Sequence, residues 1–365
     1  DFYGFEHVEF ATDHGDLVGG HYRQWLRSQG IDWRDYQDPS MHGLYNPTVD
    51  PVYRPTLPEE LYPTTFVAER SVDFVEQAAR DERPWMLQCS FPDPHHPFTP
   101  PGRFFDRYDP ADMELPFSFH DDHERSVPFL KRKFATRGTP GGFYAWAPTE
   151  DQLRRAMAAQ YGMIDMVDEA VGRVLDSLTR TGQMDNTIIL FTSDHGELMG
   201  DHGLLLKILV HYTGVLRVPL VLAGPGIARG TSGSLASSLD IGPTILDLVG
   251  VAPPVGVQGV SLVPTISEPE QRLRSEVLVE DDFKHGRDAF GIGKQNRMRT
   301  VVTESDRYTR YIGTDWTEWF SLAEDPHEMV NLAGTDPAGE GEMKDRLIDA
   351  MAMHDDVSRR PTHLA

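Results

Sequence analysis

The chain has almost no cysteine, since Cys89 is the only one among 365 residues. A lone cysteine excludes an intrachain disulfide and excludes zinc sites built on several cysteines. Long hydrophobic runs are also missing: stretches such as 188–191 and 218–223 are far too short to cross a membrane. Positive charge is scarce, and the net charge of −23 argues against a nucleic-acid partner, which would need a basic surface.

The overall composition is that of a globular protein, with 39% hydrophobic and 25% charged residues. Apolar residues at helical spacing predict helices over 64–80, 152–180 and 240–249. Short apolar runs bounded by turn residues predict buried strands over 84–91, 188–192 and 218–226. Strands that alternate with helices are typical of an α/β fold, and we expect three αβα layers with a mainly parallel central sheet.

The pattern changes from about residue 275, where short alternating runs such as "SEVLVEDD" and "RMRTVVTES" are separated by turns. Such alternation predicts a small antiparallel sheet, and helical periodicity predicts a final helix from Glu342 to about His354. We therefore expect a large α/β domain over 1–270 and a small antiparallel-sheet subdomain over 271–365.

Three Asp-His-Gly triplets stand out, at 13–15, 194–196 and 201–203. Asp194 and His195 directly follow a predicted strand, and in open α/β sheets the active site lies beyond the carboxyl ends of the strands. A carboxylate beside an imidazole is well placed to hold a divalent cation: oxygen ligands suit Ca²⁺ or Mg²⁺, and histidine favours Mn²⁺ or Zn²⁺. The alternative is that Asp194 caps a turn and His195 is an ordinary polar residue. We expect the other two triplets to be structural.

Lys207 is surrounded by apolar residues in "LLLKILV". A buried ammonium needs an anionic partner, and a substrate anion beside a metal would provide one. The alternative is a lysine whose stem lies along an apolar helix face.

His95 and His96, between prolines at a strand end, could protonate a leaving group or could be exposed loop residues. Because a residue before proline is extended, we expect their side chains to point in opposite directions.

In this order, the segments "PHHPF", "TSDHGELMGDHGLLLK", "RVPLVLAGPG" and "EDPHEMVNLA" resemble the sulfatases of the alkaline-phosphatase superfamily. The resemblance spans about residues 66–333 and implies one large α/β domain with a small C-terminal sheet. It implies hydrolysis of a small-molecule or saccharide sulfate ester, aided by a divalent cation, usually Ca²⁺.

The resemblance also implies roles for individual residues. Asp194 and His195 would bind the metal, and Lys207, thirteen residues beyond that aspartate, would hold a sulfate oxygen. His95, the first histidine of the P-H-x-P-F loop, would help the alcohol leave, and His211 would contact the substrate.

One family feature has no match in the sequence. Sulfatases carry a C/S-x-P-S/A-R motif whose Cys or Ser becomes a formylglycine nucleophile, and Cys89 in "LQCSFP" does not fit it. We therefore expect an N-terminally truncated sulfatase that is inactive by itself, with its formylglycine in the missing segment. Two alternatives remain open: a phosphonate monoester or phosphodiester hydrolase on the same scaffold, and a degenerate binding protein without catalysis.

Overall fold

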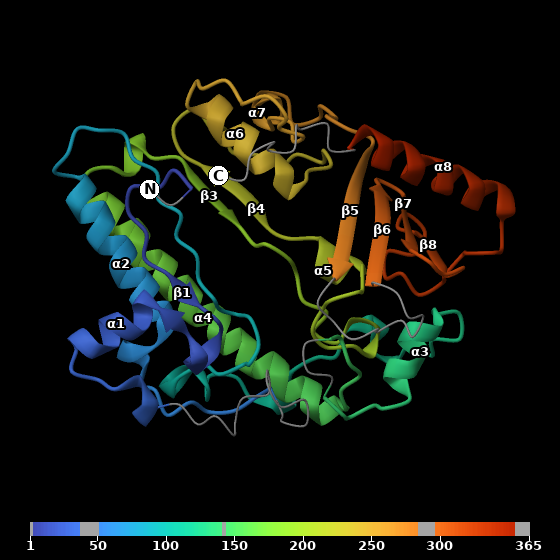
Figure 1. Ribbon diagram of the computed structural model, residues 1–365, viewed down its shortest axis with the longest axis horizontal. Helices are drawn as coiled ribbons and strands as arrows, with labels where there is room; N and C mark the ends of the chain where they lie inside the picture. The colour runs from blue at the N-terminus through green and yellow to red at the C-terminus, as the bar shows by residue number, and fades with distance from the viewer. Residues whose placement is uncertain (1–2, 37–50, 141–143, 284–295, 355–365) are drawn as a thin grey trace, which may run out of the picture.

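Two helices that lie side by side, α2 (Pro63–Ala78) and α4 (Glu150–Arg180), form the scaffold of the N-terminal half (Figure 1). The structure, a computed structural model, describes residues 3–36, 51–140, 144–283 and 296–354. Ion pairs join Glu69 to Arg173 and Glu76 to Arg180, so the two helices run in the same direction. A capping box at Thr149 begins α4, because the threonine hydroxyl accepts the Gln152 N–H and the Gln152 side chain accepts the Thr149 N–H.

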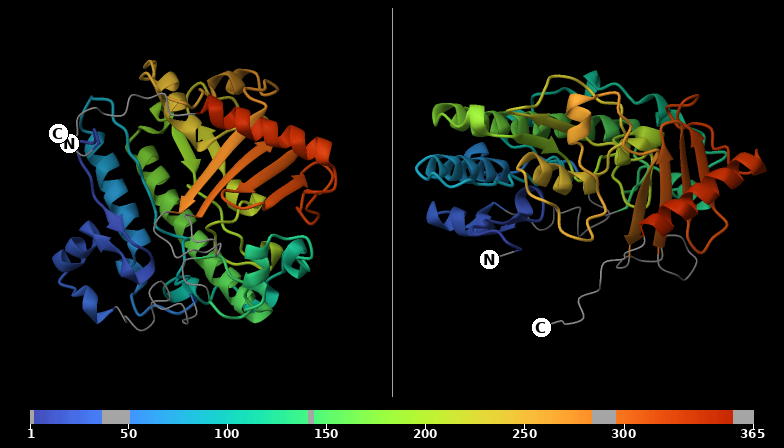
Figure 2. Two further views of the ribbon diagram at one scale, coloured as in Figure 1. Left: turned by 45° about the vertical axis from the view of Figure 1, so that its right-hand side comes forward. Right: turned by 90° about the horizontal axis from the view of Figure 1, so that it is seen from above.

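The other helices are α1 (His21–Ser28), α3 (Pro128–Phe134), α5 (Thr213–Leu216), α6 (Ile241–Leu248), α7 (Val263–Ser267) and α8 (Pro337–Met353). The strands are β1 (Ala11–Thr12), β2 (Gly19–Gly20), β3 (Ile189–Thr192), β4 (Leu220–Ala223), β5 (Glu276–Phe283), β6 (Asn296–Thr303), β7 (Asp306–Tyr311) and β8 (Thr317–Ser321). The helices expected from periodicity are confirmed as α2, α4 and α6, and α8 begins at Pro337 rather than at 342. Seen from above, α4, α2 and α1 are stacked at one end of the molecule, and β5–β8 with α8 form the other end (Figure 2).

The α/β class with a small C-terminal antiparallel sheet is confirmed, but strand direction in the larger unit differs from our expectation. β3 pairs with β4 in antiparallel register, with Leu190 opposite Leu222. A parallel pair needs a long crossover, usually a helix that covers the sheet. The chain between β3 and β4 contains only short helical turns, Asp201–Gly203 and α5, so it reverses direction instead.

Residues 84–91, expected to be a buried strand, are extended but are not hydrogen-bonded into a sheet within the described part of the chain. Every second side chain is half-buried, and the residues between them are exposed. Trp85 donates to Gln183 just before β3, and Ser71 of α2 donates to Cys89. The segment therefore packs on α2 by one face.

The C-terminal sheet has the strand order β5-β6-β7-β8, and every neighbouring pair is antiparallel. Helix α8 covers one face, where Met343 and Leu347 pack against Val301 and Tyr308. The opposite face contributes Met298, Tyr311 and Phe320 to a second core that also contains Tyr212 and residues of the loop after β3. The predicted boundary near residue 270 stays a prediction, although the new sheet begins at Glu276.

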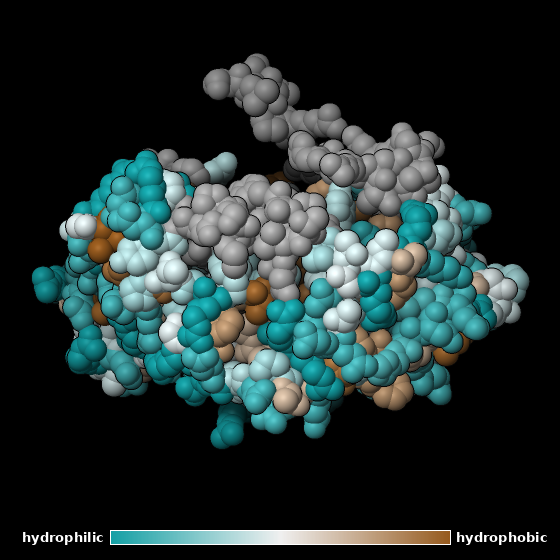
Figure 3. All heavy atoms as spheres, turned by 90° about the horizontal axis from the view of Figure 1, so that it is seen from below, coloured by the Kyte–Doolittle hydropathy of each residue, from teal (hydrophilic) through white to brown (hydrophobic). Residues whose placement is uncertain are grey.

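Hydrophilic residues predominate on the face seen from below, and hydrophobic residues are scattered among them (Figure 3). This surface agrees with a net charge of −23. Among the described residues, no helix has the length and apolar character needed to span a membrane.

Candidate active site

Asp194 and His195 lie at the carboxyl end of β3, where the chain turns away from the sheet. The Asp194 side chain is 83% exposed, and its Oδ1 accepts the His195 backbone N–H at 2.9 Å. His195 Nδ1 lies 2.9 Å from the Gly196 carbonyl oxygen, which can only accept, so Nδ1 carries a proton and Nε2 has the lone pair in the neutral ring. Nε2 is 3.5 Å from Asp194 Oδ2, and the two residues present adjacent nitrogen and oxygen ligand atoms.

Gly196 holds this turn in place because no side chain fits at its position. A Cβ there would lie 2.0 Å from the Gly214 carbonyl oxygen, and the Gly196 N–H donates to Val215 at 2.8 Å. The backbone of the turn is therefore tied to α5. The contact fixes the path of the backbone directly after Asp194 and His195.

Lys207 lies in an irregular loop rather than on a helix, so the alternative of a lysine along a helix face is excluded. Both neighbouring residues have positive φ, 72° at Leu206 and 75° at Ile208. The Lys207 side chain is 9% exposed, and its Nζ lies 3.5 Å from Glu197 Oε2 and 3.5 Å from His96 Nδ1. Burial lowers the pKa of Lys207 and raises the pKa of Glu197, whose Oε1 has no partner among the described residues.

The rings of His95 and His96 stack with centroids 4.1 Å apart and planes 24° apart. The expectation that these side chains point in opposite directions is wrong. That alternation holds only in a regular strand, whereas the His95 N–H donates to the Pro92 carbonyl in a turn. His95 Nδ1 donates to the His96 carbonyl oxygen. Burial, followed by the charge of Lys207, lowers the pKa of His95 to about 3 and that of His96 well below its ordinary value.

His14, from the triplet that we expect to be merely structural, stacks on His95 with centroids 3.6 Å apart. His195 also approaches His95, with ring centroids 6.3 Å apart. Sequence reasoning missed His14 because its partner lies 81 positions away along the chain. It also missed Glu197, although an acidic residue in the same loop as a buried lysine was a usable signal.

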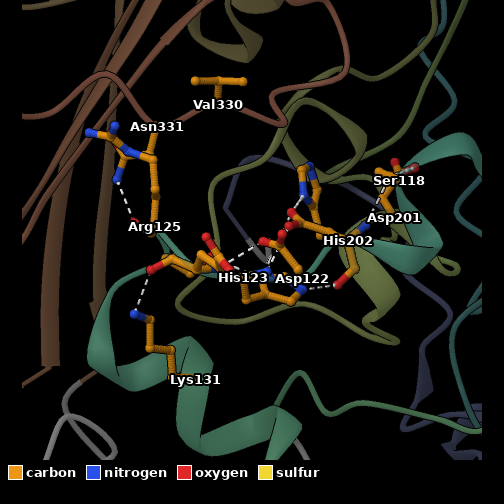
Figure 4. A network of polar contacts seen from close by, with 12 residues as sticks. Ser118, Asp122, His123, Arg125, Lys131, Asp201, His202, Val330 and Asn331 are labelled. Atoms are coloured by element: carbon orange, nitrogen blue, oxygen red, sulfur yellow. Dashed lines mark hydrogen bonds and ion pairs between the residues drawn. The ribbon is translucent and has the colours of Figure 1, made fainter. Parts of the chain in front are cut away.

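The remaining sequence-based candidates lie elsewhere. His211 is 4% exposed, and its Nδ1 lies 2.7 Å from Thr300 Oγ1 of β6, so the ring contacts the C-terminal sheet. Its role as a substrate contact stays a prediction. His202 of the 201–203 triplet is buried, and its Nδ1 bonds to Asp121 at 2.8 Å. His202 thus belongs to a network of polar contacts that also contains His123 (Figure 4), and the structural role of the triplet stays a prediction.

The described residues do not contain a complete metal site. Among them, no group of three or more His, Cys, Asp or Glu side chains converges as a metal cluster. Asp194 and His195 fit as two neighbouring ligands of a divalent cation, because one brings a free carboxylate oxygen and the other a free imidazole nitrogen. Ca²⁺ takes six to eight ligands and Zn²⁺ about four, so this pair alone does not fill a coordination sphere.

The sequence that carries this fold matches known protein families. The sulfatase family model matches residues 17–251, and a model described as the C-terminal part of N-sulphoglucosamine sulphohydrolase matches residues 200–353. The chain belongs to the sulfatase family. The two matches together include β3, the loop with Lys207 and the C-terminal sheet.

Two curated sulfatases and one solved structure illustrate the likeness. An arylsulfatase of Clostridium perfringens is 33% identical over 79% of this chain and 56% of its own length. A choline-sulfatase of Rhizobium meliloti is 32% identical over 73% of this chain and 50% of its own. This chain thus spans about half the length of those relatives. A phosphonate monoester hydrolase from Silicibacter pomeroyi superposes with a TM-score of 0.77 at 24% identity, covering 92% of this chain and 69% of that one, which shows a shared fold.

Proposed function

We propose that the full-length protein is a hydrolase of sulfate monoesters and that Lys207, His95, Asp194 and His195 belong to its active site. The observation that carries the proposal is the position of Lys207, a buried cation next to the paired histidines. Burial lowers the pKa of Lys207, and the negative charges of Glu197 and Asp194 oppose that shift. An arrangement of this kind favours an anionic group beside Lys207.

Lys207 would bind a sulfate oxygen. Its ammonium is desolvated, and within the described residues Glu197 is the carboxylate in ion-pair contact with it. A sulfate group at this position would place a second negative charge beside the Lys207 ammonium. A cation in a site of low dielectric stabilises developing negative charge more strongly than a cation in water.

His95 would donate a proton to the oxygen of the leaving alcohol. Because its Nδ1 bonds to the His96 carbonyl, Nε2 is the nitrogen left to exchange a proton with that oxygen. The low pKa of His95 would rise beside a bound sulfate, since an anion favours the protonated ring.

Sulfatases generally use a divalent cation and a formylglycine. Asp194 and His195 would hold the cation, which we expect to be Ca²⁺, and it would offset negative charge on the sulfate. We expect the formylglycine to lie outside these 365 residues. The substrate would be a small-molecule or saccharide sulfate. The names of the arylsulfatase and choline-sulfatase relatives and of the N-sulphoglucosamine sulphohydrolase family model support this proposal.

Two other functions remain as alternatives. The likeness in fold to a phosphonate monoester hydrolase favours phosphonate esters as the second candidate substrate class. A degenerate binding protein would keep the fold and the lysine but lack a nucleophile. The gene sequence upstream of residue 1 separates that case from an active enzyme.

Removing divalent cations should abolish turnover of 4-nitrophenyl sulfate by the full-length protein, and adding Ca²⁺ should restore it. Asp194→Ala should lower both activity and bound cation by about 10²-fold or more, because a directly coordinating oxygen is lost. Elemental analysis of the purified protein measures the cation. The matched control is Asp201→Asn in the 201–203 triplet. The Asp201 carboxylate accepts a hydrogen bond from Ser118, and we expect this variant to keep the wild-type cation content. Full activity after complete chelation would refute the metal role.

A further inference from the structure

His14, His95 and His96 form one stack of rings with a defined order. His14 and His96 both lie face to face with His95, at 3.6 Å and 4.1 Å between centroids. One face of an imidazole holds one stacked ring at these distances, so His14 and His96 occupy opposite faces of His95. Lys207 Nζ lies 3.5 Å from His96 Nδ1, so the lysine is at the edge of the His96 ring, and His14 lies on the other face of His95 from that ring.

The turn that carries His14 is held firmly against the histidine loop. Gly15 has φ of 59°, and a Cβ at this position would lie 3.0 Å from both Pro97 Cγ and Thr99 Oγ1. Leu17 and Val18 are buried, and Val18 packs in one core with residues of α1. Arg23 of α1 donates to the carbonyl oxygens of Leu17 and Val18. Packing of this turn therefore holds His14 against His95.

One nitrogen of His14 lacks a hydrogen-bond partner among the described residues. That nitrogen is Nδ1, which is buried from solvent. Burial, followed by the charge of Lys207, lowers the pKa of His14, so the ring is neutral at pH 7 and each nitrogen can serve one hydrogen bond. An unpartnered buried polar atom is costly unless something else satisfies it.

We propose that His14 is a specificity-determining residue that hydrogen-bonds a hydroxyl group on the alcohol portion of the substrate. The inference rests on the proposed function: with the sulfate at Lys207 and the ester oxygen at His95, the alcohol portion would lie beside His14, the ring that stacks on His95. A hydroxyl next to the ester, as in a sulfated polyol or catechol, would reach Nδ1. An alcohol without such a group would leave that nitrogen unsatisfied.

The test compares 4-nitrocatechol sulfate, which has a hydroxyl next to the ester, with 4-nitrophenyl sulfate, which has none. The measured quantity is the ratio of their kcat/KM values in the full-length enzyme. His14→Phe keeps a ring on His95 but removes both nitrogens, and we expect it to lower the ratio about ten-fold, the cost of one hydrogen bond. His120→Phe, at an exposed histidine, is the matched control and should keep the wild-type ratio.

An unchanged ratio in His14→Phe overturns the proposal, whether or not both rates fall, because a purely positional role affects both esters equally. Thermal melting of each variant separates lost binding from lost folding. If the wild type cleaves neither sulfate but cleaves phosphonate monoesters, the proposed function fails by itself. The same ratio, measured with the matched nitrocatechol and nitrophenyl phenylphosphonates, then decides the role of His14.

Discussion

Replacing Lys207 by alanine in the full-length protein should lower kcat/KM for 4-nitrophenyl sulfate by about 10³-fold. The Lys207 side chain is 9% exposed, and its ammonium lies 3.5 Å from Glu197 Oε2 and 3.5 Å from His96 Nδ1. A charge that is already desolvated and oriented stabilises the transferring sulfuryl group without reorganisation. Steady-state kinetics with the chromogenic ester measure the effect.

Two further variants separate chemistry from folding. Lys207→Ala leaves the buried Glu197 carboxylate without its partner, which destabilises the loop. The double variant Lys207→Met with Glu197→Gln removes both charges, and we expect it to recover thermal stability while activity stays low. Lys344→Ala, at an exposed position of α8, should retain full activity. A Lys207→Ala enzyme within three-fold of the wild type would show that the anion binds elsewhere.

His95→Ala should lower kcat by about 10²-fold for alkyl sulfates and less for nitrophenyl sulfates. An alkyl alcohol is a poor leaving group and needs a proton as the ester bond breaks, whereas a nitrophenolate hardly does. A plot of log kcat against leaving-group pKa should therefore become steeper in the variant. An equal loss of kcat for all leaving groups would show that His95 is not the general acid.

His96→Ala is the matched control at the neighbouring ring. From the sequence pattern we expect little effect, but the structure adds a contact of 3.5 Å with Lys207 and burial to 4% exposure. Some loss of activity therefore follows from disturbed packing around the lysine. We expect that loss to be the same for all leaving groups, and a steeper leaving-group plot for His96→Ala would exchange the roles of the two histidines.

Much of the fold could be predicted from residue patterns within single segments of the sequence. Apolar periodicity marks α4 along its whole length, and alternating residues mark all four strands of the C-terminal sheet. These elements depend on neighbours in the sequence and on one buried face. The position of Asp194 and His195 followed in the same way, because a strand end is visible in the sequence.

Contacts between distant segments could not be predicted. Residues 84–91 have the composition of a strand, but pairing depends on a partner that a single segment does not reveal. The loop around Lys207 contains positive φ values at Leu206 and Ile208, which no helix or strand pattern anticipates. The stack of His14 on His95 depends on Gly15 packing against Pro97, and local sequence gives no sign of that contact.

The central claim is that these residues form a site for sulfate monoesters. The most direct measurement is kcat/KM of the cation-loaded, full-length protein with 4-nitrophenyl sulfate, 4-nitrophenyl phenylphosphonate and bis(4-nitrophenyl) phosphate under identical conditions. We predict that the sulfate ester exceeds the other two by about ten-fold or more, the discrimination that one extra oriented interaction provides. A phosphonate or phosphodiester rate above the sulfate rate would contradict the account.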